Sequence, residues 1–266
     1  MRILYLGDVM ASPGLELIER ALPGLRRELK VDVVIVQAEN VSDGKGVTQQ
    51  DFARLKKAGV DFCTGGNHTF AKPEINALLS DPNQPIIRPA NYPDVPGLGY
   101  KFLSTSKGSI LVISILGQIV GKDADKLLNN PLQTMDAILQ ATSGEPHVAT
   151  VVNFHGDFSS EKVVFGHYLD GKVSMVVGDH WHVPTADARV LPGGTAHMTD
   201  VGMCGVLNSS LGVTFESILP RWHDGLVTRN VVATEPPFQL NGLLTDIDTK
   251  TGLATSAQAI RRIYKD

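Results

Sequence analysis

Cysteines, clusters of basic residues and long apolar segments are scarce in this sequence, and each scarcity excludes a class of protein. The 266 residues include two cysteines, Cys63 and Cys204, which are too few for a disulfide framework and are typical of a reducing compartment. No apolar stretch approaches the ~20 residues that cross a bilayer, so we expect a cytoplasmic protein without a membrane partner. The formal net charge is −4 and the basic residues are dispersed, so we expect no duplex nucleic acid as a partner.

Internal repeats, low-complexity tracts and linkers are also lacking. Because 42% of the residues are hydrophobic, the chain can fill a large core, and we expect a single domain over residues 1–266. The last part of the chain, from about residue 185 to 266, is predicted to be rich in hairpins. Turns typical of hairpins occur there at Gly193–Gly194 and at 248–252.

Apolar runs and amphipathic stretches alternate along the chain, which predicts an α/β fold. Strands are expected at 2–7, 32–40, 60–63, 86–93, 147–155 and 173–182. Helices are expected at 12–30 and 48–59, with Ser12 and Thr48 as N-caps, and also from residue 73, over 131–141 and over 159–169. An antiparallel hairpin is predicted after residue 100 with its turn at Lys107–Gly108, and further hairpin strands near 226–234 and 238–263. Together these elements predict a mixed sheet or a two-sheet sandwich flanked by helices.

Polar side chains directly follow several of the predicted strands. They are Asp8 after the first strand, Glu39 and Asn40 after the second, Asn67 and His68 after the third, His155 at the end of a later strand, and His180 and His182 at the end of another. The carboxyl ends of strands form the ligand-binding edge of open α/β sheets, so we expect these residues to converge. His180 and His182 alternate on one predicted strand and should point to the same face. Each motif alone could be a turn, a helix cap or a solvent-facing pair, but their joint occurrence favours a ligand set.

The residue types in this set indicate a particular metal chemistry. Two carboxylates, up to two amide oxygens and three imidazoles are too many ligands for one tetrahedral zinc ion. They suit two divalent ions that share a bridging carboxylate, and nitrogen and oxygen ligands without thiolate fit manganese, iron or zinc. Two such ions carry more positive charge than Asp8 and Glu39 remove, and the surplus suits a phosphate substrate.

The segments around these residues resemble one family closely. They are GDVMASPG, QAENVSDGKGVT, GGNHTF, RPANYP, NFHGDF, GDHWHVP and AHMTDVGM, in this order between residues 1 and 205. They resemble the YmdB-like metallophosphoesterases, calcineurin-like bacterial enzymes that hydrolyse cyclic nucleotides. The resemblance implies a calcineurin-like sandwich of two mixed β-sheets flanked by helices. It also implies one metal on Asp8, Glu39, Asn40 and His182, a second on Glu39, Asn67, His155 and His180, and His68 as the catalytic acid.

The activity that the resemblance implies is hydrolysis of 2′,3′-cyclic or 3′,5′-cyclic mononucleotides by a dinuclear phosphodiesterase. A hydroxide bridging two metals, iron or manganese foremost and zinc otherwise, would attack phosphorus while His68 protonates the departing oxygen. Alternatives on the same core stay open: a phosphomonoesterase, a nuclease on short single strands, or a regulatory nucleotide-binding protein with little turnover. Assembly into a homo-oligomer also stays open.

Four positions depart from the pattern of the family, so the resemblance does not predict which residues surround the substrate in this chain. Leu15 stands where an arginine is usual, Asn153 where an aspartate is common, and Asp179 and Trp181 where small polar residues are usual. On an extended segment Trp181 would point away from the flanking histidines and pack in the core. If the segment leaves the sheet before Asp179, the indole would instead reach the mouth of the site and stack on a nucleobase.

Overall fold

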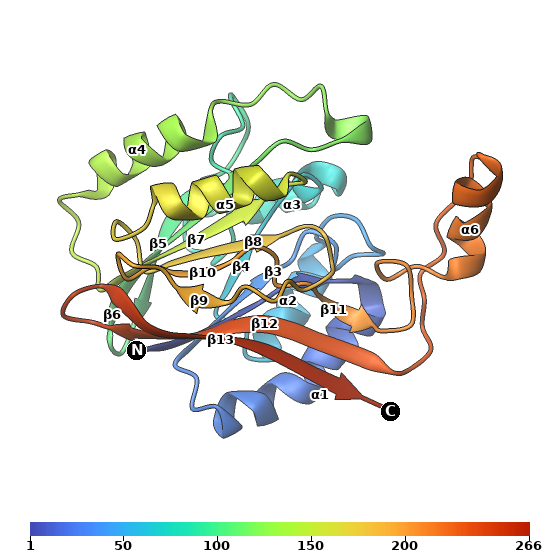
Figure 1. Cartoon of the computed structure of the whole chain (residues 1–266), viewed down its shortest axis with the longest axis horizontal. Coiled ribbons are helices and arrows are strands. Elements are labelled where there is room, and N and C mark those ends of the chain that lie inside the picture. Colours follow the sequence, from blue (N-terminus) through green and yellow to red (C-terminus); the bar gives the residue numbers. More distant parts are fainter.

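The computed structural model is a sandwich of two β-sheets with helices on its outer faces (Figure 1). It describes residues 1–266, the side chain of residue 122 excepted. Helices α1 (Ala11–Glu28) and α2 (Gln49–Lys57) lie on one side, and α4 (Pro131–Thr142) and α5 (Ser159–Tyr168) lie on the other. The predicted fold class is therefore confirmed.

The first sheet has seven strands and holds the amino terminus of the chain in its middle. Its order is β2-β11-β12-β1-β3-β4, with β13 on β12. The strands are β1 (Arg2–Leu6), β2 (Asp8–Val9), β3 (Val33–Gln37), β4 (Phe62–Thr64), β11 (Met203–Val206), β12 (Phe238–Asp248) and β13 (Leu253–Tyr264). Strand β1 is parallel to β3 and antiparallel to β12, and β3 is parallel to β4.

The second sheet has six strands in the order β5-β6-β7-β8-β10-β9. They are β5 (Tyr100–Thr105), β6 (Gly108–Leu116), β7 (Ala149–His155), β8 (Met175–Asp179), β9 (Arg189–Val190) and β10 (Ala196–Met198). The inner strands are parallel, and the two edge strands are antiparallel to their neighbours. The parallel strands of this sheet therefore end at one edge.

The continuous apolar runs of the strands arise because both faces of each sheet are covered. Ile3 and Tyr5 belong to the core between the two sheets, whereas Leu4 and Leu6 belong to the core beneath α1 and α2. The core between the sheets also includes Val112 of the second sheet. The two sheets therefore share one core, and the single domain over residues 1–266 stays a prediction.

Several predicted elements are confirmed with their turns and caps. The hydroxyl of Thr48 accepts a hydrogen bond from the backbone N–H of Asp51 and caps α2. Strands β5 and β6 form the predicted hairpin, although its turn is at Ser106–Lys107 and Gly108 already belongs to β6. Strands β12 and β13 form the C-terminal hairpin. The C-terminal part is not wholly antiparallel, however, because β10 is parallel to β8 and β11 is parallel to β2.

Two helix starts differ from the prediction. Ser12 is not an N-cap, because α1 begins at Ala11 and its N-cap residue, Met10, makes no side-chain capping bond. The helix predicted from residue 73 is α3, which begins at Ile75 and ends at Ser80, after the short 3-10 helix η1 (Thr69–Ala71). The other short 3-10 helix is η2 (Gly121–Asp123).

The strand predicted over 86–93 is wrong. Only an isolated bridge between Ile86 and Cys63 joins the described part of this segment to the first sheet. Pro89 lacks the N–H that a strand would pair. The guanidinium of Arg88 donates to the carbonyls of Pro89 and Ala90 instead, at 2.7 and 3.0 Å.

The segment after β11 contains a helix that the sequence did not indicate. Helix α6 (Phe215–Asp224) is capped by Thr214, whose hydroxyl accepts from the N–H of Ser217, and Pro220 lies inside it. An internal proline normally indicates a break, so it concealed the helix. Figure 1 shows α6 projecting from the sandwich.

The strand predicted over 226–234 is reduced to an isolated bridge between Val232 and Val213. Of the described helices, none combines the length and apolarity needed to cross a membrane.

Candidate active site

The predicted site residues come together at one edge of the sandwich, where strands of both sheets end. Asp8 follows β1, Glu39 and Asn40 follow β3, Asn67 and His68 follow β4, His155 ends β7, and His180 and His182 follow β8. Glu39 Oε1 from the first sheet lies 3.0 Å from His155 Nε2 of the second. Both sheets thus deliver polar side chains to one buried cluster.

His155, Glu39 and Asn67 form the first half of the cluster. His155 Nδ1 lies 2.6 Å from Asp179 Oδ1, which leaves Nε2 to face Glu39 and Asn67. Asn67 Oδ1 is 2.9 Å from His155 Nε2, and Asn67 Nδ2 donates to Asp123 Oδ2 at 2.8 Å, which fixes this orientation of the amide. Glu39 Oε1 is buried and forms no hydrogen bond within the described chain. One nitrogen and two oxygen atoms with lone pairs therefore converge on one point.

The electrostatics of this half require a positive charge. Burial lowers the pKa of His155, but the carboxylates of Glu39 and Asp179 outweigh burial and raise that pKa well above its usual value. Burial likewise raises the pKa of Glu39, but the charge of His155 outweighs it and lowers that pKa. A divalent cation fits this donor set, because it would supply the charge that a proton on His155 otherwise supplies.

Asp8, Asn40 and His182 form the second half of the cluster. Asn40 Nδ2 lies 2.8 Å from Asp8 Oδ1 and 3.2 Å from His182 Nε2. His182 Nδ1 donates to the carbonyl of Leu211 at 3.0 Å, so its Nε2 faces Asp8 Oδ1 at 3.6 Å. Burial raises the pKa of Asp8, but the nearby imidazoles, His182 foremost, outweigh burial and hold that pKa below its usual range. Asn40 presents its amide nitrogen here, and ligation through Oδ1 requires the amide to turn.

The prediction that His180 and His182 alternate along a strand is wrong. Both residues lie in a turn that follows β8, and this turn brings them to the cluster. Strand β8 ends at Asp179, and both histidines have left-handed backbones with φ of 100° and 63°. Such conformations cost about 1–3 kcal/mol for residues other than glycine and concentrate at functional sites. One ligand atom from each of His180, His155 and Glu39 lies within 4.8 Å of the others. The turn therefore places the imidazole of His180 beside His155 and Glu39, a position that continuation of the strand would not give it.

A buried lysine and aspartate, which the sequence did not single out, hold this turn. Lys162 Nζ donates to Asp179 O and Asp200 Oδ2, each at 2.7 Å, and Asp200 Oδ2 also accepts from Trp181 N. Lys162 Nζ lies 4.0 Å from the centre of the Trp181 ring, whose Nε1 donates to Asp157 O. The indole is thus fixed by Lys162 and Asp157, but it is only partly buried, so these contacts and not packing in the core hold it. Lys162 carried no signal in the sequence, because a lysine on a helix is usually solvent-exposed.

The other departures from the family pattern lie beneath the cluster and not at its rim. Asn153 Nδ2 and the Tyr5 hydroxyl donate to Asp179 Oδ2, at 2.6 and 2.9 Å. These bonds fix the carboxylate that orients His155. Leu15 is fully buried in the core between the first sheet and α1.

His68 lies beside both halves of the cluster. Its Nδ1 is 2.8 Å from Asn40 Oδ1, and its backbone N–H donates to Glu39 Oε2 at 2.7 Å. Because Asn40 occupies Nδ1 in either orientation of the amide, Nε2 is the nitrogen left for proton transfer. Burial lowers the pKa of His68 and outweighs the opposite effect of Glu39.

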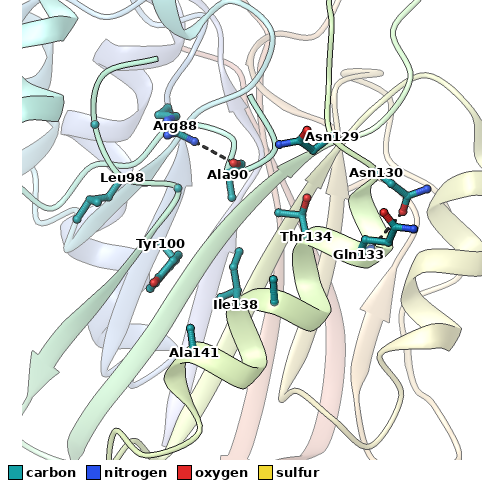
Figure 2. A pocket seen from close by; sticks show the side chains of 13 residues that line it. Arg88, Ala90, Leu98, Tyr100, Asn129, Asn130, Gln133, Thr134, Ile138 and Ala141 are labelled. Atoms are coloured by element: carbon teal, nitrogen blue, oxygen red, sulfur yellow. Dashed lines mark hydrogen bonds between the residues drawn. The ribbon is translucent and has the colours of Figure 1, made fainter. Parts of the chain in front are cut away.

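A pocket of about 560 Å³ opens onto the cluster. Asn40, His68, His180 and His182 line it together with residues of α6 and of the segment before it. A second cavity of about 590 Å³ lies between α4 and the segment from Arg88 to Tyr100 (Figure 2). The residues that line this second cavity include no carboxylate, imidazole or thiol. Of these two cavities, only the one beside His68 is lined by groups that can bind a metal or transfer a proton.

Comparison with known proteins links this geometry to a family. The sequence model of a family described as "YmdB-like protein" matches residues 4–260. A Bacillus subtilis (strain 168) protein named 2′,3′-cyclic-nucleotide 2′-phosphodiesterase is 38% identical over 262 residues, which cover 98% of this chain and 96% of that protein. These matches confirm the resemblance predicted from the motifs.

Solved structures agree in fold over almost the whole chain. A hypothetical protein from Thermus thermophilus superposes with a TM-score of 0.90 at 34% identity, covering 99% of this chain and 100% of that chain. A structure described as a novel phosphatase from Mycoplasma pneumoniae superposes with a TM-score of 0.92 at 31% identity, covering 100% of this chain and 94% of that chain.

Proposed function

Since this chain belongs to the YmdB-like protein family, we propose that it is a dinuclear, metal-dependent phosphodiesterase that hydrolyses cyclic mononucleotides. The observation that carries the proposal is the convergence of carboxylate, amide and imidazole groups from both sheets beside one pocket. The name of the Bacillus subtilis relative supports 2′,3′-cyclic mononucleotides as substrates, and 3′,5′-cyclic mononucleotides belong to the same proposal.

The residues that would hold the two metals divide as the two halves of the cluster do. One set is Asp8, Glu39, Asn40 and His182, and the other is Glu39, Asn67, His155 and His180, with Glu39 shared. Nitrogen and oxygen donors without thiolate suit iron or manganese, and zinc as an alternative. When bound, two such ions supply Lewis-acid activation of water and neutralise charge on the phosphate.

His68 is proposed to give a proton to the oxygen that leaves phosphorus. Asn40 holds the ring through Nδ1, so the proton moves from Nε2. Burial lowers the pKa of His68 and so disfavours the doubly protonated ring. The proton that moves is the one that Nε2 carries when the Asn40 amide turns and donates from Nδ2 to His68 Nδ1. Glu39 fixes the main chain of the same residue through its N–H, so the acid keeps its position relative to the cluster.

The size of the pocket supports a small substrate. Its volume of about 560 Å³ lies in the range of ~300–1,000 Å³ that is typical of small-molecule sites. We also propose a cytoplasmic location, which the free and buried thiols of Cys63 and Cys204 support.

A substrate panel on protein of measured metal content tests the proposal. Protein loaded with Mn²⁺ should hydrolyse 2′,3′-cyclic AMP or 3′,5′-cyclic AMP, and a chelator should abolish the activity. Hydrolysis of 3′-AMP alone would show a phosphomonoesterase, and nucleotide binding without turnover would show a regulatory protein. Either result would overturn the proposal.

A further inference from the structure

Helix α6 forms a wall of the same pocket that the polar cluster lines, and this wall has its own chemistry. Of the residues of α6, Ile218, Arg221 and Trp222 line the pocket. They lie at spacings of three and four residues, so they share one face of the helix. One side of the pocket can therefore hold phosphate, and the other offers an indole and a guanidinium.

Trp222 is exposed in a way that its packing does not explain. Its side chain is 80% exposed, although indoles are usually well buried. The chain has two tryptophans, Trp181 and Trp222, and both line this pocket. Trp181 is fixed by the bond of its Nε1 to Asp157 O, whereas the broad face of Trp222 is available to a ligand.

Arg221 adds positive charge to the same wall. Its Nη2 donates to Thr228 O at 2.9 Å, to Thr228 Oγ1 at 3.1 Å and to Asn230 Oδ1 at 3.0 Å. These partners are all neutral, and no described carboxylate forms an ion pair with this guanidinium. The charge is therefore held in place and not neutralised, which suits an anionic ligand.

The base of α6 is anchored next to the cluster. Ile218 packs with Met10, Met203 and Val213 in a small core, and Met10 lies two residues after Asp8. The N–H of Thr214 donates to Val231 O at 2.8 Å, which ties the start of the helix to the chain that returns from it. The wall therefore has a fixed position relative to the cluster.

We infer that α6 is the nucleoside-binding wall of this pocket, with the nucleobase stacked on Trp222 and Arg221 attracting the anionic ligand. The inference rests on the proposed function and names the part of the substrate that the polar cluster does not recognise. Stacking on an indole accepts every base, so we expect little preference among adenine, guanine, cytosine and uracil. Phe215 and Leu219, also exposed on α6, do not line the pocket and have no part in this role.

Kinetics on paired substrates test the inference. Trp222→Ala should lower kcat/KM for 2′,3′-cyclic AMP about 10-fold or more, mainly through KM, and should change kcat/KM for the base-free glycerol 1,2-cyclic phosphate less than about 2-fold. Trp222→Phe should retain most of the activity, because a phenyl ring also stacks. Leu219→Ala is the matched control from the same helix and should leave both substrates unaffected. Equal losses on both substrates for Trp222→Ala would overturn the inference.

Fluorescence gives a readout that does not depend on catalysis. Adenosine 3′-monophosphate should quench the tryptophan emission of the unaltered protein and of Trp181→Phe, and should quench that of Trp222→Phe much less. If Trp222→Phe is quenched as strongly as the unaltered protein, or the unaltered protein is not quenched, the inference is wrong. If neither cyclic substrate is hydrolysed, the proposed function fails, and the quenching still decides whether the base stacks on Trp222.

Light scattering tests whether α6 instead contacts a second copy of the chain. Trp222→Ala and Leu219→Ala should both show the mass of the unaltered protein. A loss of mass in both variants would assign this face to contact with a second copy and overturn the inference.

Discussion

His155 Nδ1 lies 2.6 Å from Oδ1 of Asp179, and both side chains are completely buried. This contact determines which nitrogen of the imidazole faces Glu39 and Asn67. A carboxylate can only accept a hydrogen bond here, so it holds the proton on Nδ1 and keeps Nε2 as an acceptor or ligand.

We therefore expect Asp179→Asn to weaken metal binding about 10- to 100-fold, because an amide can donate to Nδ1 and shift the ring proton to Nε2. Metal content after dialysis against graded chelator concentrations measures the change. Asp170→Asn is the control, since Asp170 accepts from Gly193 N at 2.7 Å in the loop between β9 and β10. An Asp179→Asn protein with unaltered metal affinity would show that the ring is oriented by other contacts.

His68 and His155 should separate catalysis from metal binding. His68→Ala should retain metal and lose about 10²- to 10⁴-fold in kcat, the usual contribution of a general acid. His155→Ala should lose metal as well, because its Nε2 faces the cluster directly. Elemental analysis beside the kinetics distinguishes the two, and a metal-depleted His68→Ala protein would make His68 a ligand.

Gly66 is a position where one methyl group should disrupt the cluster. A Cβ there would come closer than 3.0 Å to Glu39 Oε2 and to the ring of His155. We expect Gly66→Ala to lower metal content per chain below that of the unaltered protein. Gly24→Ala, in α1, is the control because a Cβ there meets nothing within 4 Å. Equal metal content in the two variants would contradict the crowding at Gly66.

The buried pair of Lys162 and Asp200 should contribute strongly to stability. Lys162→Met leaves Asp200 as a buried charge without its cation, which typically costs about 3–5 kcal/mol. Chemical denaturation measures the loss. Lys107→Met removes a surface pair with Asp32, in which the lysine side chain is 51% exposed, and should cost at most about 1 kcal/mol. Similar losses for both variants would mean that the buried pair has no special role.

The sequence predicted most of the residues of the cluster because they directly follow apolar strands, a pattern that survives errors of a few residues in strand length. His180 shows why the details escaped prediction: its left-handed backbone depends on bonds from Lys162 and Asp200, which are distant in the sequence. Helix α6 escaped because Pro220 outweighed the capping signal of Thr214. The metal-binding roles of the cluster residues stay predictions.

Strand β1 has a consequence for the order in which the protein assembles. It is made long before β12, yet along its whole length it pairs with β12, from Leu6 opposite Gly242 to Arg2 opposite Asp246. All strands of the second sheet lie within residues 100–198, so they are synthesised while β1 still lacks this neighbour. At about 5–20 residues per second, the chain from there to the end of β12 takes about 2–10 s to be synthesised. During that interval Asp8, which follows β1, and Glu39, which follows β3, belong to a sheet that still lacks β12, so we expect the polar cluster to reach its final geometry only after β12 has joined β1.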